Sequence, residues 1–143
     1  MEVFNTDLED VKASSTNNIM QYLCNLEGYK VKLKNLHWSA TCMSIHTRID
    51  ELTDELNEFE DLLAETYQGI YTQFDSNFLR ASIETSDNIY TLVDKLLLET
   101  KILHSGISEM GDEVVLKSII EDFISYLYKF KYLLKIIKRG NNE

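Results

Sequence analysis

The side chains best suited to chemistry form two pairs with the same spacing. His46 stands four residues before Asp50. Asp61 stands four residues before Glu65. Residues four apart lie one turn apart on the same face of a helix, so each pair presents two ligand groups together. Asp50 and Asp61 are 11 residues apart, which is about three whole turns, and the two pairs therefore share one helix face.

The distance between the two pairs decides how they can act together. Eleven helical residues span about 16 Å, which is too far for one metal centre within one chain. If two copies of the segment lie antiparallel, centred near Leu56, His46 and Asp50 of one copy face the acidic pair of the other. This arrangement predicts two equivalent sites in a dimer. His37, which a short link joins to His46, would complete each site.

The predicted donor set contains two imidazoles and three carboxylates, which suit Fe(II) and also accept Mn(II) or Zn(II). The expected metal-binding and catalytic residues are His37, His46, Asp50, Asp61 and Glu65. A di-iron site inside one bundle normally uses Glu-x-x-His, and this motif is absent, because Lys34, Met43 and Lys101 stand three residues before the histidines. The alternative is a solvated flank of an acidic helix. Its other acidic members are Glu51, Asp54, Glu55, Glu58 and Glu60.

Apolar residues at alternating steps of three and four predict four amphipathic helices to position these side chains. The first helix is expected to begin at Ser15 or Thr16, and the third to hold Ile89 through Leu103 and stop at Ser105-Gly106. The expected core residues are Ile19, Tyr22, Leu26, Tyr29, Leu33 and Leu36; Ile45, Ile49, Leu52, Leu56, Phe59, Leu63 and Ile70; Ile89, Leu92, Val93, Leu96, Leu97 and Leu103; and Leu116, Ile120, Phe123, Leu127, Phe130, Leu134 and Ile137.

The sequence therefore predicts an all-α fold, a four-helix bundle with a long crossover between the second and third helices. The crossover covers about 69–82, and its apolar residues suggest a short packed helix or turn around Phe78 and Ile83. The expected organisation is a mobile acidic tail over 1–14, the bundle over 15–139 and a C-terminal tail over 140–143. His104, at the end of the third helix, is expected to act only as a partial cation there.

Charge and composition narrow the classes of partner. The chain has 14 Lys and Arg against 24 Asp and Glu, a formal net charge of −10, which disfavours nucleic acids and anionic membranes and favours cations. No apolar run reaches the roughly 18 residues of a membrane span, and no signal peptide is recognisable, so a cytoplasmic location is expected. Cys24 and Cys42 match no zinc spacing and are expected to be free thiols, with a disulfide left open.

Three segments resemble the ferroxidase region of the Dps-type mini-ferritins (DNA-binding proteins from starved cells), members of the ferritin-like superfamily. The segments are Lys34-Asn35-Leu36-His37-Trp38, His46-x-x-x-Asp50 and Asp61-x-x-Ala64-Glu65. The resemblance implies that the two histidines and Asp50 come from one subunit and the acidic pair from its neighbour. It also implies a hollow dodecamer that oxidises Fe(II) with hydrogen peroxide or oxygen, stores the ferric mineral and protects against oxidative stress. Trp38 is expected to pack beside the site.

Weaker likenesses and some departures accompany this resemblance. Phe78-Leu79-x-x-Ser82-Ile83 is similar to the family's short middle helix, and Gly111-Asp112-Glu113 to the start of its last helix. The link from His37 to His46 is shorter than is usual in the family, and Lys117 stands where an acidic pore residue often occurs.

These departures leave other functions open. Many family members bind DNA through a basic tail, but here the tail is acidic, so DNA binding by that route is not expected. The acidic residues of the tail are Glu2, Asp7, Glu9 and Asp10, against Lys12. The shortened link, with a composition typical of AT-rich microbial or viral genomes, favours as the alternative a non-enzymatic structural or adaptor protein that keeps the bundle. A DNA-protecting role is the third possibility.

Overall fold

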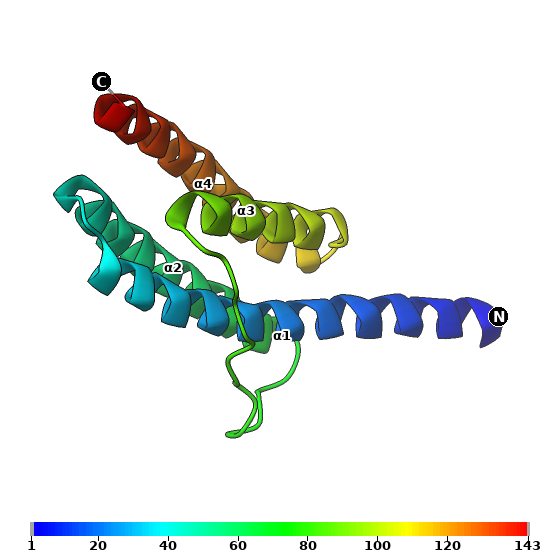
Figure 1. Ribbon diagram of the computed structural model, residues 1–143. Helices are drawn as coiled ribbons and strands as arrows, with labels where there is room; N and C mark the ends of the chain where they lie inside the picture. The colour runs from blue at the N-terminus through cyan, green and yellow to red at the C-terminus, as the bar shows by residue number, and fades with distance from the viewer. Residues whose placement is uncertain (1, 143) are drawn as a thin grey trace.

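The computed structural model is a bundle of four α-helices joined by two short links and one long connection (Figure 1). The structure describes the backbone of residues 2–142 and the side chains of residues 18–140. The helices are α1 (Glu2–Ser39), α2 (Met43–Ile70), α3 (Ile89–Ser105) and α4 (Glu113–Asn142). No strand occurs in residues 2–142, so the prediction of an all-α fold is confirmed.

Each helix packs mainly against two others. α1 contacts α2 and α3, and α4 contacts the same two helices, so α1 and α4 lie on one diagonal of the bundle. The short links reverse the chain between α1 and α2 and again between α3 and α4 (Figure 1). None of the described helices is both long and apolar enough to cross a membrane.

The predicted apolar stripes meet at the centre of the bundle. All of the expected core residues are buried except Leu36, Ile45, Ile70 and Ile137, which are partly buried. Burying one such side chain stabilises the fold by roughly 1.5–3 kcal/mol, and this burial is the main reason why the four helices stay together. Phe59 of α2 and Phe123 of α4 stack across the core with their ring centres 4.0 Å apart.

Two predicted helix ends differ from the structure. The backbone of α1 is helical from Glu2, not from Ser15 or Thr16, and α4 continues through Gly140 to Asn142. The chain has no proline, and one glycine costs a helix only about 1 kcal/mol, so neither region contains a strong stop signal. Side chains before Asn18 lie outside the described residues, and the mobility of the acidic tail stays a prediction.

The ends of α3 are where the sequence places them. The Asn88 side chain accepts a hydrogen bond from the Thr91 amide at 3.0 Å and caps the beginning of α3. Gly106 follows its last residue. Gly111, with a φ of +68°, turns the chain into α4, which begins at Glu113 as expected.

The connection between α2 and α3, residues 71–88, contains no helix, so of the short helix or turn predicted around Phe78 and Ile83 only a turn is present. A single turn closes where the Phe78 amide donates to Asp75 O at 3.0 Å. Beyond it the backbone is extended and crosses α1, where the Ser82 amide donates to the carbonyl oxygen of Cys24 at 3.2 Å. This bond to α1 takes up a backbone donor that a helix would have used internally.

Candidate metal centre

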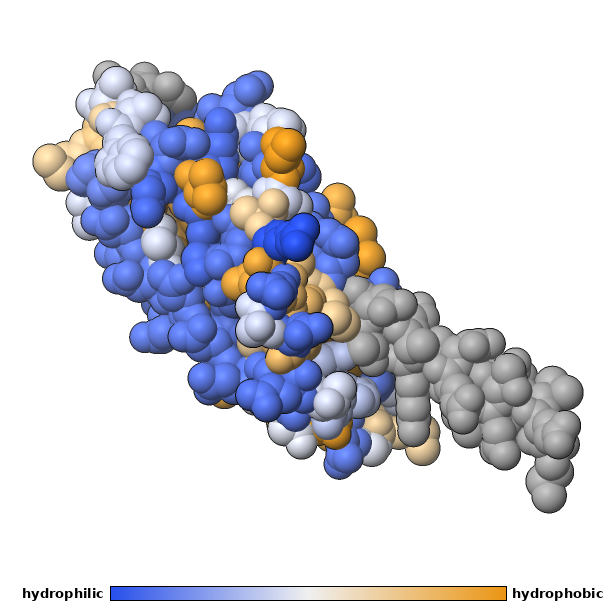
Figure 2. All heavy atoms as spheres, turned by 90° about the horizontal axis from the view of Figure 1, so that it is seen from below, coloured by the Kyte–Doolittle hydropathy of each residue, from blue (hydrophilic) through white to orange (hydrophobic). Residues whose placement is uncertain are grey.

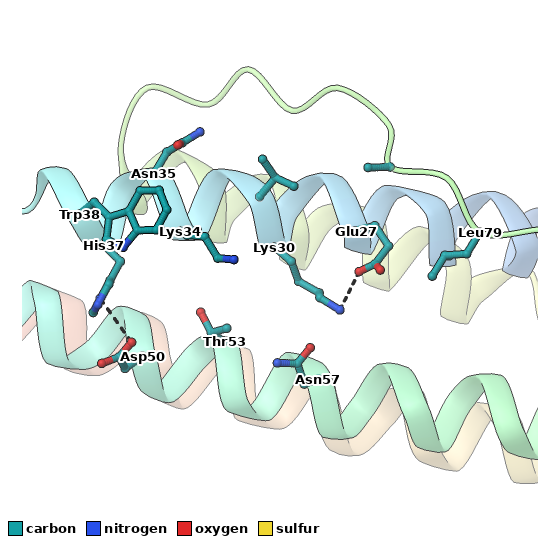
Figure 3. A pocket seen from close by; sticks show the side chains of 12 residues that line it. Glu27, Lys30, Lys34, Asn35, His37, Trp38, Asp50, Thr53, Asn57 and Leu79 are labelled. Atoms are coloured by element: carbon teal, nitrogen blue, oxygen red, sulfur yellow. Dashed lines mark ion pairs between the residues drawn. The ribbon is translucent and has the colours of Figure 1, made fainter.

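The link between α1 and α2 gathers three of the five predicted ligands. His37 lies in the last turn of α1, whereas His46 and Asp50 lie in the first two turns of α2. One possible ligand atom from each residue lies within 4.8 Å of the others. His37 and Asp50 face each other across the two helices in Figure 3. Although the link is short, it brings the two histidines together.

The two histidines hold each other through the backbone. His37 Nδ1 lies 3.2 Å from the carbonyl oxygen of His46, and His46 Nδ1 lies 3.0 Å from the carbonyl oxygen of His37. Their rings stack with centres 3.8 Å apart and planes 21° apart. A carbonyl oxygen only accepts hydrogen bonds, so each Nδ1 is the donor in these two contacts. A ring that is neutral with its proton on Nδ1 has its lone pair on Nε2, which is then the atom able to bind a metal ion.

Asp50 adds a carboxylate at the edge of this pair. Its Oδ1 lies 3.3 Å from His37 Nδ1, and its side chain is 62% exposed. A carboxylate beside the N–H of a ligating imidazole orients the ring and raises its basicity. Asp50 can therefore orient His37 with one oxygen while the carboxylate stays open to a metal ion from the solvent side.

Asp61 and Glu65 do not join this cluster. Both are exposed on α2, beyond Asp50 by 11 and 15 residues, or about 16 and 22 Å along the helix. Within one chain the structure therefore separates the predicted ligands into a group of three and an exposed pair. No other group of three metal-binding side chains lies close together in the part of the chain that the structure describes.

A groove runs from the cluster along α1 and α2. Its volume is about 660 Å³, and the connection closes one side of it with Leu79. Trp38 lies at its edge but is 73% exposed, so it does not pack into the bundle beside the site. The Lys34 ammonium stands 6.0 Å from the centre of the indole ring. Figure 2 shows a mostly hydrophilic surface with separate apolar spots.

An ionic cluster at the far end of the groove was not predicted. Glu60, expected on the solvated acidic face, is only 7% exposed, and its Oε1 accepts from the Lys30 ammonium at 3.0 Å. Lys30 also pairs with Glu27 at 2.6 Å. Burial raises the pKa of Glu60 against the opposing effect of Lys30. The available signal was that Glu60 follows Leu56 by four residues, at the edge of the apolar stripe.

Other residues that the sequence singles out have structural roles. His104, at the end of α3, pairs with Glu121 of α4 at 2.8 Å. Lys117 is buried, donates to the carbonyl oxygen of Ile107 at 3.0 Å and lies 3.6 Å from the Glu109 carboxylate. Cys24 and Cys42, both in the described part, are not joined by a disulfide.

Comparisons of the chain with protein-family models, curated protein sequences and solved structures found no match. The functional argument therefore depends on the site itself. The site consists of the two imidazoles and one carboxylate of His37, His46 and Asp50, which lie close together. Two further carboxylates are exposed on α2, too far along the helix to reach this group within one chain.

Proposed function

We propose that this chain is an iron-binding protein of the mini-ferritin type, which oxidises Fe(II) at sites shared between two copies and stores the ferric product in a hollow oligomer. The single observation that carries the proposal is the gathering of His37, His46 and Asp50 within 4.8 Å. The supporting observation is that Asp61 and Glu65 remain exposed on the same helix.

The geometry of α2 supports a site shared between two copies. Asp50, Asn57 and Asp61 follow one another at about two-turn and one-turn intervals and occupy one side of the helix. Two such helices in antiparallel contact near Leu56 bring the acidic pair of each copy to the histidines of the other. Asn57 lies close to the axis, where a neutral side chain avoids repulsion between identical charges. Trp38 supports this contact, because it is exposed and lines the same groove as Asp50.

The donor set fits Fe(II) as a substrate. The Nε2 atoms of His37 and His46 supply two neutral nitrogen ligands, and the three carboxylates supply oxygen ligands and three negative charges. Two Fe(II) ions held there are able to give one electron each to hydrogen peroxide. The O–O bond then breaks and two hydroxides form, so no hydroxyl radical is released. The ferric ions hydrolyse and pass to the mineral.

The first test replaces the exposed pair by neutral residues of the same shape. Asp61→Asn with Glu65→Gln should abolish rapid Fe(II) oxidation, followed by the absorbance of the ferric product. Glu51→Gln with Glu55→Gln is the matched control, because it removes the same charge from exposed positions about 100° and 140° around α2 from Asp50. Unchanged kinetics in the first variant, or an equal loss in the control, would remove the ferroxidase proposal.

A mixing experiment tests whether two chains share each site. His46→Ala removes one half of every site, and the Asp61→Asn, Glu65→Gln variant removes the other half. A mixed dimer of these two inactive chains contains one intact site and one site that lacks both halves. Random mixing should therefore recover about a quarter of the wild-type rate, because about half of the dimers are mixed. No recovery, with exchange of chains verified, would contradict a shared site, and a wild-type chain that stays metal-free would favour the structural or adaptor role.

A further inference from the structure

A hollow with an apolar wall and an acidic rim is formed by α2 and the connection. Its volume is about 230 Å³. Phe74 and Phe78 line it, and their rings stack with centres 4.2 Å apart. Asp61 and Asp75 also line it, are exposed, and have no ionic partner among the described side chains. This hollow, the Phe78 pocket, therefore suits an apolar group that has a positive charge beside it.

The groove of the histidine cluster offers such a group at one end. Trp38 is the only tryptophan of the chain and is 73% exposed. An aromatic side chain that packs buries roughly 150–250 Å², so an exposed indole ring leaves a large apolar area in water. The Lys34 ammonium stands 6.0 Å from the centre of this ring and has no ionic partner in the part of the chain whose side chains are described. Trp38 and Lys34 together match what the Phe78 pocket suits.

The groove and the Phe78 pocket form one continuous line along the bundle. Leu79 lines both hollows. In Figure 3, Trp38 and Leu79 lie at opposite ends of the groove. The α2 residues that line the two hollows lie within about 100° of the helix circumference and so belong to one side of α2. They are Asp50, Thr53 and Asn57 in the groove and Glu60, Asp61 and Ala64 in the pocket.

Trp38 cannot enter the Phe78 pocket of its own chain. It follows His37, which lies 3.3 Å from Asp50. The pocket is lined by α2 only within residues 60–64, about 15 Å or more further along the helix. A second copy removes this separation. In an antiparallel pair centred near Leu56, position 50 of one α2 faces position 62 of the other, which lies within the pocket range.

We propose that Trp38 and Lys34 dock into the Phe78 pocket of a second copy of this chain. The indole ring packs against the stacked rings of Phe74 and Phe78, and the Lys34 ammonium pairs with Asp75 at the rim. Each copy gives one Trp38 and receives one, so the contact is isologous and closes at two copies. Its register rests on the antiparallel α2 contact of the proposed function, whereas the docking itself needs no metal ion.

Symmetry selects Trp38 as the occupant. The other lysine–aromatic contacts among the described side chains are those of Lys101 with Tyr128 and of Lys138 with Tyr90, and both join α3 to α4. A contact between that side of the bundle and the pocket joins two different surfaces, so it does not close in a pair. Trp38 lines the groove on the same side of α2 as the pocket, and one two-fold axis therefore fills both pockets at once.

The fluorescence of the single tryptophan reports this contact in the full-length chain. As metal-free protein is concentrated through dimer formation, followed by sedimentation, the emission of Trp38 should shift to the blue and its quenching by acrylamide should fall, because the ring leaves water. Phe78→Ala should weaken the dimer by about tenfold or more and leave Trp38 open to acrylamide. Ile83→Ala is the matched control, since Ile83 is on the same connection, is 91% exposed and lies outside the pocket.

A charge exchange tests the pocket without removing its apolar wall. Lys34 and Asp75 are both exposed, so substituting them leaves the core intact. Lys34→Glu and Asp75→Lys should each weaken the dimer by about threefold or more, because an exposed attraction becomes a repulsion. Combining the two substitutions should restore the dimer. Lys101→Glu is the control, since this lysine stands beside Tyr128 and not beside Trp38.

The outcomes separate this inference from the ferroxidase proposal. A metal-free dimer with a protected Trp38, together with recovery in the charge exchange, supports the docking even if the chain never oxidises Fe(II). A chain that stays monomeric, a dimer whose Trp38 remains open to acrylamide, or a protected Trp38 that neither the Phe78 nor the Asp75 variant affects would overturn it. Rapid iron oxidation by a chain with an open Trp38 would keep the ferroxidase proposal and remove this one.

Discussion

At the scale of single residues, the contact between the two histidines fixes both rings in the orientation that the proposed metal site requires. A flexible imidazole pays an entropic cost when a metal ion fixes it, and a ring fixed beforehand does not. The carbonyl oxygen of His37 belongs to the last turn of α1 and accepts only a long hydrogen bond from the Ala40 amide, at 3.5 Å, so the contact of His46 Nδ1 also satisfies the end of that helix. The same contact therefore positions the candidate ligands and completes the end of the helix.

This mutual contact predicts one tautomer for both rings in the metal-free protein. The ¹⁵N spectrum of labelled histidine, recorded where the imidazoles are neutral, should show Nδ1 protonated and Nε2 unprotonated in His37 and His46. Adding Co(II), a stand-in for Fe(II) that resists oxidation, should perturb the Nε2 signals first. His104, whose Nε2 faces Glu121 at 2.8 Å, serves as the internal control. Protonated Nε2 atoms in the two cluster rings would contradict the predicted ligand atoms.

At the scale of the elements, the long connection is held to α1 by a close approach that only glycine allows. A Cβ atom added to Gly28 would stand 2.1 Å from the carbonyl oxygen of Ser82, which is far inside contact distance. The Ser82 amide and hydroxyl both bond to Cys24 O on the same helix. The connection is thus held at the position where α1 has no side chain to keep it away.

Gly28→Ala should lower the free energy of unfolding by about 1–3 kcal/mol, because the connection has to move away from α1. Chemical denaturation followed by circular dichroism measures the change. Gly69→Ala in α2 is the control, since an added Cβ there meets nothing within 4 Å, and it should instead stabilise the helix by up to about 1 kcal/mol. A Gly28 variant as stable as the Gly69 variant would show that the connection is not fastened at this point.

The difference between periodic helices and the extended connection explains how much of the structure could be predicted from the sequence. Helices such as α3 were predicted closely because apolar residues repeat at helical spacing and Asn88 and Gly106 mark the ends. The crossing of Ser82 over Gly28 was not predicted, because an extended segment that bonds to another helix leaves no periodic pattern. The ion pair of Glu60 with Lys30 was not predicted for a related reason: the two residues are distant in sequence, and only the position of Glu60 four residues after Leu56 indicated the edge of the core.

The contacts of Glu84, where the connection meets α3, predict that the stability of the fold depends on pH. Glu84 accepts hydrogen bonds from the amide and hydroxyl of Ser86, and its Oε2 lies 3.1 Å from the Lys95 ammonium. Burial works to raise the pKa of Glu84, but Ser86 and Lys95 outweigh it and hold the pKa below its ordinary value. A lowered folded-state pKa stabilises the fold above the unfolded-state pKa of about 4.3, and this stability is lost as the pH falls through the folded value.

Glu84→Gln should therefore lower the free energy of unfolding by about 1 kcal/mol at neutral pH and have little effect near pH 3, where the wild-type carboxylate is also protonated. Denaturation series at several pH values measure this difference. Asp87→Asn, an exposed change in the same segment, should have little effect throughout. A cost that stays constant down to acid pH would mean that packing, and not charge, is what Glu84 contributes.

At the scale of the whole molecule, the proposed division of the site between two copies would couple metal binding to assembly. An ion that receives three ligands from a single chain and five from a dimer binds the dimer more tightly, and by linkage it tightens the dimer by the same factor. The exposed position of Asp61 and Glu65 is what makes this coupling possible, because neither residue is held by the rest of its own chain.

Saturating Co(II) should therefore strengthen dimer formation by about tenfold or more, measured by sedimentation over a dilution series, which corresponds to about 1.4 kcal/mol of coupling. His46→Ala should abolish the effect of the metal without dissolving the basal contact, whereas His104→Ala, which lies outside the cluster, should leave it intact. If Co(II) binds tightly but leaves the dimer unchanged, His37, His46 and Asp50 form a complete site within one chain. Asp61 and Glu65 would then have no part in binding the metal, and α2 would need no second copy of the chain to complete the site.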